Sequence, residues 1–449
     1  MKIFEIISML FKLFIKNPRE FVNQINKDNY KTLKSALLNE SPDQIFTNAK
    51  SLLKSTRKIE ESRILQRVTY FTKRINFQNQ SPLLITFSHE ASRTGAPLII
   101  LEFAKIAKLK HGYNIIQILC KGGEIIKEFE EIGYTYTLDY YSNNKGLKIE
   151  LEALMNQLVS KLNIPKNTPI YINSEGSTKC MKFLHSLGFQ NQTSLIHELA
   201  NYYPNNSWNH IEKYSKNIVF PATFVKDQAL IHNKISENKV HVIPQGLLKP
   251  ELYTEDIEIS RAFVRRQLNI PETAHIILGC GSKIARKGTD LFVTIAINYL
   301  LSTQKRDVHF VWLGDSPMNE LQVWLGRDIE ISNLNTNIHL AGQVKDTSKW
   351  FVGSDIFLLT SRGDPLPCVI YEAIAAKLHI ILYKGTTGYS DLMGFIPGTL
   401  LEFIDIPGTI RTIEQLIAND QSQSSQKQSK KLTDFLDMER YTNQLIALS

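Results

Sequence analysis

Short apolar runs alternate with helix-length amphipathic stretches from about residue 83 to the end of the chain. Each run is rich in Ile, Val, Leu or Phe. Strands that read as continuous apolar runs are buried on both faces, and their alternation with helices is typical of a parallel sheet covered by helices on both sides. This pattern constrains the fold more than any other feature of the sequence.

The apolar runs fall into two sets. The first set lies at 83–90, 114–122, 169–175, 193–199, 217–223 and 240–246, and the second at 275–282, 308–315, 337–344, 354–361 and 379–386. Helix candidates in the second set include 289–302 and 367–377. We predict an α/β protein with two doubly wound domains joined near 247–262. Their natural ligand site is the crevice facing the carboxyl ends of both sheets.

The predicted domains follow from these sets, and a length of 449 residues allows about two or three of them. A basic helical extension covers 1–80, a first Rossmann-like domain 81–248, and a second 249–425. A closing helix lies within 426–449, next to a polar low-complexity stretch at 421–431.

Charge is concentrated at the N-terminus. The net charge is +8, and residues 1–80 alone hold 15 basic and 7 acidic side chains, so the remainder is neutral. An even basic coat would favour nucleic acid, whereas a basic segment on a neutral body points to a local anionic contact. We therefore expect no nucleic-acid partner.

Residues 1–20 predict an amphipathic helix with one polar stripe. Glu5 interrupts the apolar region and no small-residue cleavage site follows, which argues against a signal peptide. Two interpretations stay open: a helix lying on an anionic membrane surface, or a helix docked on the protein's own core. No apolar run reaches the about 18 residues that cross a bilayer. The four cysteines, which lack C-x-x-C spacing, indicate thiols in a reducing compartment.

Two loops of the second domain carry the clearest chemistry. The basic loop (residues 281–288) places Arg286 and Lys287 just before a helix, which suits a diphosphate, although a solvated basic turn is the alternative. The acid turn (residues 361–367) contains Asp364, and Glu372 follows on the next helix, predicted to start at Pro367. Carboxylates suit hydroxyl groups rather than phosphate. Together the loops describe a site for a nucleotide joined through phosphates to a sugar.

The first domain offers weaker candidates. Gly95 marks a loop at a helix start, with Arg93 nearby, which fits phosphate or a plain tight turn. His197 and His89 each follow an apolar run and would face the same crevice, where a structural role is the alternative.

Taken together, these motifs resemble the retaining glycosyltransferases of GT-B architecture, in the group usually called family four. The resemblance covers roughly 83–449. It rests on Asp364 and Glu372 as an acid pair with seven intervening residues, on GSKIARKG as a diphosphate loop, and on SHEASRTGAP and LIHEL in the first domain. It implies two facing Rossmann-like domains and an enzyme that transfers a sugar from a nucleotide-diphosphate donor, keeping the anomeric configuration.

The resemblance also implies residue roles. Arg286 and Lys287 would neutralise the donor diphosphate, Asp364 would hold the transferred sugar, and Glu372 the ribose. Catalytic work is thus assigned to Arg286, Lys287, Asp364, Glu372 and His197, donor binding to Gly281, Ser282, Val344, Leu366, Cys368 and Val369, and the acceptor side to Arg93, Gly95 and His89. The family needs no metal or cofactor, and its acceptors are glycans or lipid-linked sugars. The resemblance implies a cytoplasmic protein. Contact of residues 1–20 with the inner membrane face stays open as an alternative.

Two departures from the family pattern bear on activity. The first acid is usually Glu, one methylene longer than Asp364, and Ser282 stands where the family often has Arg. They keep a second function class open, a catalytically silent GT-B-shaped binding or partner subunit.

Overall fold

The computed structural model describes residues 59–77, 81–200, 205–318, 320–389, 396, 398–419 and 434–449. The predicted amphipathic helix at 1–20 and the low-complexity stretch at 421–431 lie outside these residues. The described residues divide into two compact units, one of residues 59–76 with Ser142–Ile164 and one of the described residues within Phe77–Tyr141 and Pro165–Ser449.

The smaller unit pairs the helical residues 59–74 with α7 (Asn144–Leu162). The Thr72 hydroxyl donates to Gln157 Oε1 at 2.8 Å, and Gln157 Nε2 donates to Thr69 Oγ1 at 2.9 Å. Arg67 forms an ion pair with Glu150 at 3.2 Å, and the Glu150 side chain is fully buried. The described part of the basic extension is therefore a helix bonded to α7.

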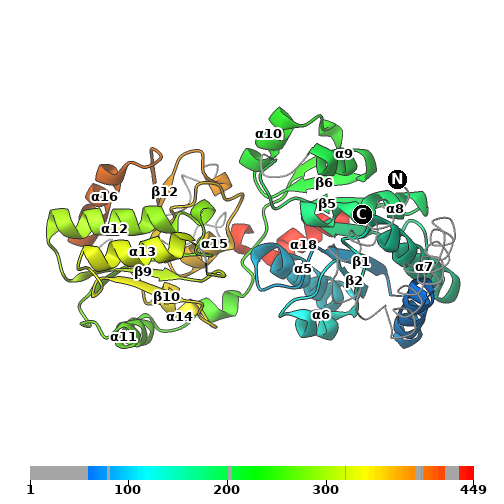
Figure 1. The fold of residues 1–449 in the computed structure, drawn as a ribbon, viewed down its shortest axis with the longest axis horizontal. Coiled ribbons are helices and arrows are strands. Elements are labelled where there is room, and N and C mark those ends of the chain that lie inside the picture. The colour runs from blue at the N-terminus through cyan, green and yellow to red at the C-terminus, as the bar shows by residue number, and fades with distance from the viewer. Residues whose placement is uncertain are drawn as a thin grey trace, which may run out of the picture. The chain divides into compact units, whose positions relative to one another are not determined.

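The larger unit begins with a parallel sheet in the strand order β3-β2-β1-β4-β5-β6-β7. Its strands are β1 (Leu83–Ser88), β2 (Asn114–Leu119), β3 (Tyr134–Thr137), β4 (Ile170–Asn173), β5 (Gln192–Leu195), β6 (Asn217–Phe220) and β7 (Val240–Val242). The helices of this domain are α5 (Gly95–His111), α6 (Ile126–Ile132), α8 (Met181–Ser186), α9 (Asn205–Tyr214) and α10 (Thr223–His232). Figure 1 shows this sheet among its helices.

A second parallel sheet has the order β10-β9-β8-β11-β12-β13. Its strands are β8 (His275–Cys280), β9 (Val308–Leu313), β10 (Ile338–Gly342), β11 (Ile356–Leu358), β12 (His379–Tyr383) and β13 (Gly398–Leu401). The helices are α11 (Ile257–Leu268), α12 (Thr289–Thr303), α13 (Glu320–Ile331), α14 (Ser348–Val352), α15 (Cys368–Ala375) and α16 (Ile406–Ala418). In both sheets the strand order reverses beside the first strand of the domain, which is where doubly wound folds bind ligands.

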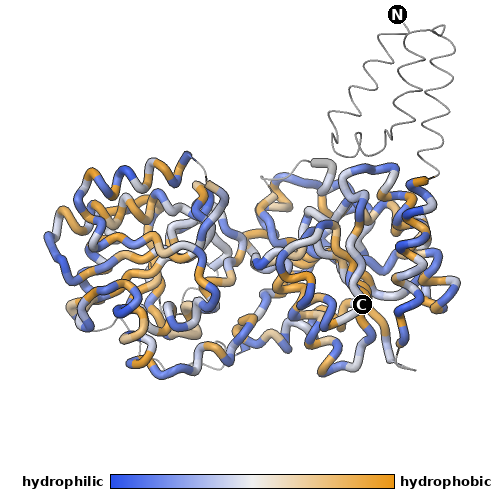
Figure 2. The backbone as a smooth tube through the Cα atoms, turned by 60° about the horizontal axis from the view of Figure 1, so that its bottom comes forward, coloured by the Kyte–Doolittle hydropathy of each residue, from blue (hydrophilic) through white to orange (hydrophobic). Residues whose placement is uncertain are grey.

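Both faces of the second sheet are buried, as its apolar runs require. On β9, Phe310 and Trp312 pack in one cluster with α12, α13 and α16, while Val311 and Leu313 pack in another with α11, α14 and α15. Figure 2 shows the strands of both sheets as hydrophobic segments within more hydrophilic surroundings. The prediction of two doubly wound Rossmann-like domains is confirmed.

The C-terminal helix α18 (Met438–Ala447) belongs to the first domain's core. Its residues Met438, Tyr441 and Leu445 are buried in the same cluster as Phe103 of α5. The Tyr171 hydroxyl of β4 donates to Leu445 O at 3.0 Å, and Figure 1 shows α18 beside α5. The chain therefore crosses from the second domain back to the first before it ends.

Within the part of the chain that the structure describes, no helix is long and apolar enough to cross a membrane. Of the four cysteines, Cys120 and Cys180 are buried and Cys280 and Cys368 are half-buried.

Candidate functional site

Loops from both sheets line one cavity of about 580 Å³ in the larger unit. The first domain contributes His89, Thr94, Gly95, Ala96, Ile99, His197, Glu198, Leu199, Pro221 and Gln245. The second contributes Ser282, Arg286, Lys287, Gly363, Asp364, Pro365, Leu366, Pro367, Cys368 and Val369. Most of the residues that the sequence singles out therefore meet at the carboxyl ends of the strands.

The basic loop runs from the end of β8 to the start of α12, and Gly288 fixes its course. Gly288 adopts φ +73°, in the left-handed region. A Cβ at this position would lie 1.9 Å from the carbonyl oxygen of Thr360, and the Thr360 hydroxyl donates to Gly288 O at 2.8 Å. Only glycine lets the basic loop approach the end of β11 this closely.

The carboxylate of Asp364 gathers the cations of the basic loop. Lys287 Nζ forms an ion pair with Asp364 Oδ2, and Arg286 Nη1 lies 3.4 Å from Asp364 Oδ1. Arg286 Nη1 also donates to Gly363 O at 3.0 Å. The Asp364 side chain is 8% exposed and that of Lys287 17%. A nearly buried carboxylate thus holds two cations at the cavity.

The acid turn is itself held on two sides. Arg362 makes a bidentate ion pair with Asp290 of α12 at 2.8 and 2.6 Å, and its backbone N–H donates to Arg286 O at 2.9 Å. Burial would raise the pKa of Asp290, but the Arg362 hydrogen bonds hold it below its ordinary value. On the other side, Asp364 N–H donates to Thr386 O at 2.8 Å. Arg362, Gly363 and Asp364 therefore form a turn that an ion pair and backbone hydrogen bonds hold in place.

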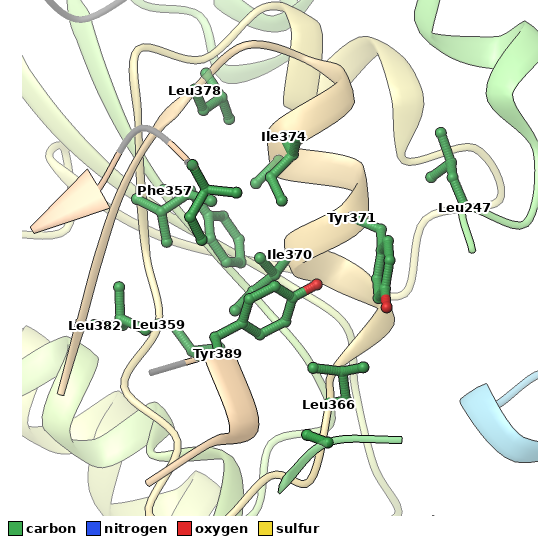
Figure 3. Packing of buried hydrophobic residues seen from close by; sticks show 14 of the residues in the cluster. Leu247, Phe357, Leu359, Leu366, Ile370, Tyr371, Ile374, Leu378, Leu382 and Tyr389 are labelled. Carbon is green, nitrogen blue, oxygen red and sulfur yellow. The ribbon is translucent and has the colours of Figure 1, made fainter. Parts of the chain in front are cut away.

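Hydrophobic residues pack around α15, the helix that follows the acid turn. Figure 3 shows Leu366, Ile370, Tyr371 and Tyr389 gathered around α15. The Tyr371 ring stacks on Phe435, with centroids 4.7 Å apart and planes 8° from parallel. Helix α15 begins at Cys368, one residue later than predicted, because Pro367 keeps an extended ψ of 130°.

His197 stands on the first domain's side of the cavity as a neutral imidazole. Asn173 Nδ2 donates to Ala96 O at 3.0 Å, so Asn173 Oδ1 is an acceptor, and His197 Nε2 lies 2.8 Å from it. His197 Nε2 therefore carries the proton, and Nδ1 is left as an acceptor. Burial lowers the pKa of His197 to about 4, despite the opposing effect of Glu198.

Three polar residues were missed by the sequence reasoning: Glu198 and Gln245, which line the cavity, and Asn173, which contacts His197 behind it. Glu198 accepts the backbone N–H of His197 at 3.0 Å and that of Glu175 at 3.1 Å. Asn173 orients His197, and Gln245 lies after β7 with its amide 2.8 Å from Leu366 O. Each ends or follows an apolar run, so a polar side chain at a strand end was the available signal.

Four of the predicted site residues do not line the cavity. Gly281 O accepts the Trp312 indole N–H at 2.9 Å, and Val344 packs against the core of the second domain. Arg93 forms an ion pair with Glu128, and its backbone N–H donates to Glu124 at 2.9 Å. Glu372 is the fourth and lies on α15, outside the cavity lining.

Glu372 occupies a different environment from Asp364. Thr347 Oγ1 donates to Glu372 Oε2 at 3.3 Å. Burial raises the pKa of Glu372 to about 7, against the lowering effect of hydrogen bonds from Thr347 and Tyr253. Burial likewise raises the pKa of the Cys368 thiol to about 12, so that thiol is protonated at neutral pH. Among the described residues, no group of three or more His, Cys, Asp or Glu side chains could hold a metal ion.

The geometry separates two kinds of chemistry. Arg286 and Lys287 offer positive charge for an anion, whereas His197 and Gln245 offer neutral polar groups that suit hydroxyls. The fold that carries this site is the GT-B fold. The chain is similar in structure to HepE of Anabaena, solved in complex with UDP-glucose, with a TM-score of 0.67 and 16% identity over 81% of this chain and 98% of that one.

Sequence comparison places the second domain in a family. Residues 274–419, which contain the basic loop, the acid turn and Glu372, match the model of "Glycosyl transferases group 1". This part of the chain is similar to group 1 glycosyl transferases and the chain has a GT-B fold, in agreement with the family that the sequence motifs resemble.

Two curated proteins resemble part of the chain. The lipopolysaccharide glucosyltransferase WaaG of Escherichia coli is 26% identical over 161 residues, which is 35% of this chain and 41% of WaaG. The lipopolysaccharide core biosynthesis glycosyltransferase LpsE of Rhizobium meliloti is 23% identical over 156 residues, or 35% of this chain and 43% of LpsE. The matched region spans less than half the length of these relatives.

Proposed function

We propose that this protein transfers a sugar from a nucleotide-diphosphate donor to a glycan or lipid-linked acceptor. The observation that carries the proposal is the pairing of Arg286 and Lys287 with the nearly buried Asp364 at the cavity. Cations held beside a helix start can neutralise a diphosphate, and the same cations stabilise it as a leaving group. The group 1 match over 274–419 covers these residues and supports the assignment.

Residue roles extend the proposal. The donor diphosphate would take over Arg286 and Lys287, which would release the Asp364 carboxylate to accept hydroxyls of the transferred sugar. Glu372 would accept the ribose hydroxyls, and His197 Nδ1 would accept a hydroxyl from the first domain's side. Because HepE was solved with UDP-glucose and WaaG is a glucosyltransferase, UDP-glucose is the first donor to test.

The mechanism proposed is front-face displacement with retention of the anomeric configuration. In this scheme the departing phosphate takes the acceptor's hydroxyl proton, and Arg286 and Lys287 stabilise the charge that develops on it. The cations would do the work that a metal ion does in other transferases, so we propose a metal-independent, cofactor-independent reaction. Enclosure of the donor in the cavity would limit hydrolysis by water.

A catalytically silent binding or partner subunit is the second candidate. Ser282 and the short Asp364 favour it, because both depart from the family pattern at the cavity. A nucleotide-sugar epimerase of the same architecture is a third, and it would form product without an acceptor.

A donor panel separates these functions. Nucleotide sugars are first ranked by thermal shift, since a bound donor stabilises the fold by mass action, and nucleotide release is then measured with and without glycan acceptors. The transferase proposal predicts turnover of at least one donor and loss of most turnover in Lys287→Ala. Absence of turnover for every donor, together with donor binding unchanged in Lys287→Ala, would sink the proposal. An epimeric nucleotide sugar formed without acceptor and without nucleotide release would indicate the epimerase.

Membrane contact through residues 1–20 is a separate proposal, for a protein that works at the cytoplasmic face of the inner membrane. The lysine-rich polar stripe of this segment supports it. Sedimentation with anionic liposomes should retain the full chain and lose a variant without residues 1–20. Equal sedimentation of both would remove the membrane interpretation and favour docking on the protein's own core.

A further inference from the structure

Gln245 is a polar residue at the cavity that the proposed mechanism does not use. It follows β7 in the segment that leads to the second domain, and the residue is 2% exposed. Its Nε2 donates to Leu366 O at 2.8 Å, which fixes the orientation of the amide. Its Oε1 is buried without a hydrogen-bond partner among the described residues.

The backbone around Gln245 is rigidly held. Pro244 O accepts from Arg440 Nη2 at 2.8 Å, and Leu247 N–H donates to Leu436 O at 2.9 Å. At Gly246, a Cβ would lie 2.3 Å from the backbone nitrogen of Met438, so the backbone packs directly against the start of α18. The unpaired Oε1 is therefore placed before any ligand arrives.

An unpaired amide oxygen selects its ligand by chemistry. It is an acceptor with partial negative charge, so it suits a hydroxyl and not a phosphate. Its anchor, Leu366, lies two residues after Asp364, whose carboxylate gathers Arg286 and Lys287. The nucleoside end is expected near Glu372 and Val344, neither of which lines the cavity. The group nearest Gln245 is then the sugar.

We propose that Gln245 Oε1 accepts a hydrogen bond from a hydroxyl of the transferred sugar, and so acts as a donor-specificity residue; this rests on the proposed function. The two ends of the amide have different roles: Nε2 donates to Leu366 O of the acid turn, and Oε1 accepts from the sugar hydroxyl. His89 Nδ1, a second buried atom without a partner among the described residues, lies on a residue of the same cavity. The sugar region therefore has spare hydrogen-bonding capacity in two places.

The test compares two ligands and two glutamines by calorimetry. Gln192 is a matched control, because it is also buried, donates through Nε2 to Phe189 O at 2.9 Å, has an unpaired Oε1 and lies outside the cavity. Gln245→Met also removes the Nε2 contact with Leu366 O, so the change in UDP affinity measures the loss of that anchor. UDP-glucose binding should weaken roughly 3- to 10-fold more than UDP binding, the range of one neutral hydrogen bond. Gln192→Met should change the affinity for neither ligand.

The outcomes separate the two proposals. Equal weakening of UDP and UDP-glucose in Gln245→Met would assign Gln245 to holding the acid turn alone, and no weakening would remove it from the site; either result overturns the sugar contact. Binding of no nucleotide sugar by the wild type would sink the proposed function and this contact with it. With a set of monodeoxy donors, the difference in affinity between wild type and Gln245→Met should fall to the difference seen with UDP for the analogue that lacks the contacted hydroxyl.

Discussion

The two sides of the cavity use different chemistry. On the second domain's side, Asp364 joins Lys287 and Arg286 in an ion-paired group. On the first domain's side, His197 is neutral, Asn173 sets its tautomer, and Gln245 presents an amide oxygen. A ligand with charge at one end and hydroxyls at the other is complementary to both. The contrast supports the proposal of a nucleotide-diphosphate sugar as the ligand, over a free sugar or a free phosphate.

Among the substitutions considered, removing the charge of Asp364 should have the largest effect on the difference between the two sides of the cavity. Asp364→Asn frees Lys287 and Arg286 for the diphosphate but takes the charged acceptor from the sugar hydroxyls. We expect turnover of the donor to fall roughly 10- to 100-fold, the range for hydrogen bonds to a charged group, while UDP binding is unchanged or tighter. Steady-state kinetics and calorimetry with UDP measure the two effects. A parallel loss of turnover and UDP binding would mean that Asp364 only maintains the loop.

The basic loop depends on Gly288, and its rigidity can be tested without any ligand. Gly288→Ala forces a left-handed φ of +73° on alanine and a contact 1.9 Å from Thr360 O. We expect the Tm to fall by about 5 °C or more. Gly326→Ala on α13 is the control, since a Cβ there meets nothing within 4 Å and helix propensity favours alanine. A Gly288→Ala variant as stable as Gly326→Ala would contradict the close approach of the two loops.

Glu372 sharpens the comparison because, among the described residues, this acid of the same domain forms no ion pair with a cation. Its pKa is raised to about 7 in the folded protein, so the stability it contributes is complete below its unfolded pKa and is lost as pH rises toward 7. Glu372→Gln should therefore match the wild type near pH 4.5 and exceed its Tm by roughly 2–5 °C at pH 8. Melting curves across this range measure the difference. A difference in Tm between Glu372→Gln and wild type that grows toward low pH would contradict a raised pKa for Glu372.

The sequence predicted the interior strands and the edge strands β7 and β10, but it missed the edge strands β3 and β13. Continuous apolar runs mark β1 and β8, which lie inside their sheets. The structure adds β3 and β13, which lie at sheet edges and are mostly half-buried. An edge strand covers less apolar surface, so YTYT at 134–137 carries too weak a pattern to be recognised.

Site residues divide in a similar way. Loops that end in charged or glycine-rich motifs, such as the basic loop and the acid turn, could be predicted because charge and turn chemistry are visible in sequence. Asn173 and Gln245 could not, because their roles depend on which backbone carbonyl each amide meets across the fold. Ala96 lies 77 residues from Asn173, and Leu366 lies 121 from Gln245. The roles of Arg93 and Gly281 in the acceptor and donor regions stay predictions.

Titration of UDP into Lys287→Ala and Lys305→Ala tests the central claim most directly. Both lysines belong to the second domain, but Lys305 pairs with Glu414 at 2.8 Å, outside the cavity. The account predicts that Lys287→Ala weakens UDP binding roughly 10- to 100-fold and that Lys305→Ala leaves it unchanged. Unchanged UDP affinity in Lys287→Ala would show that the diphosphate is not bound by the basic loop and would contradict the account.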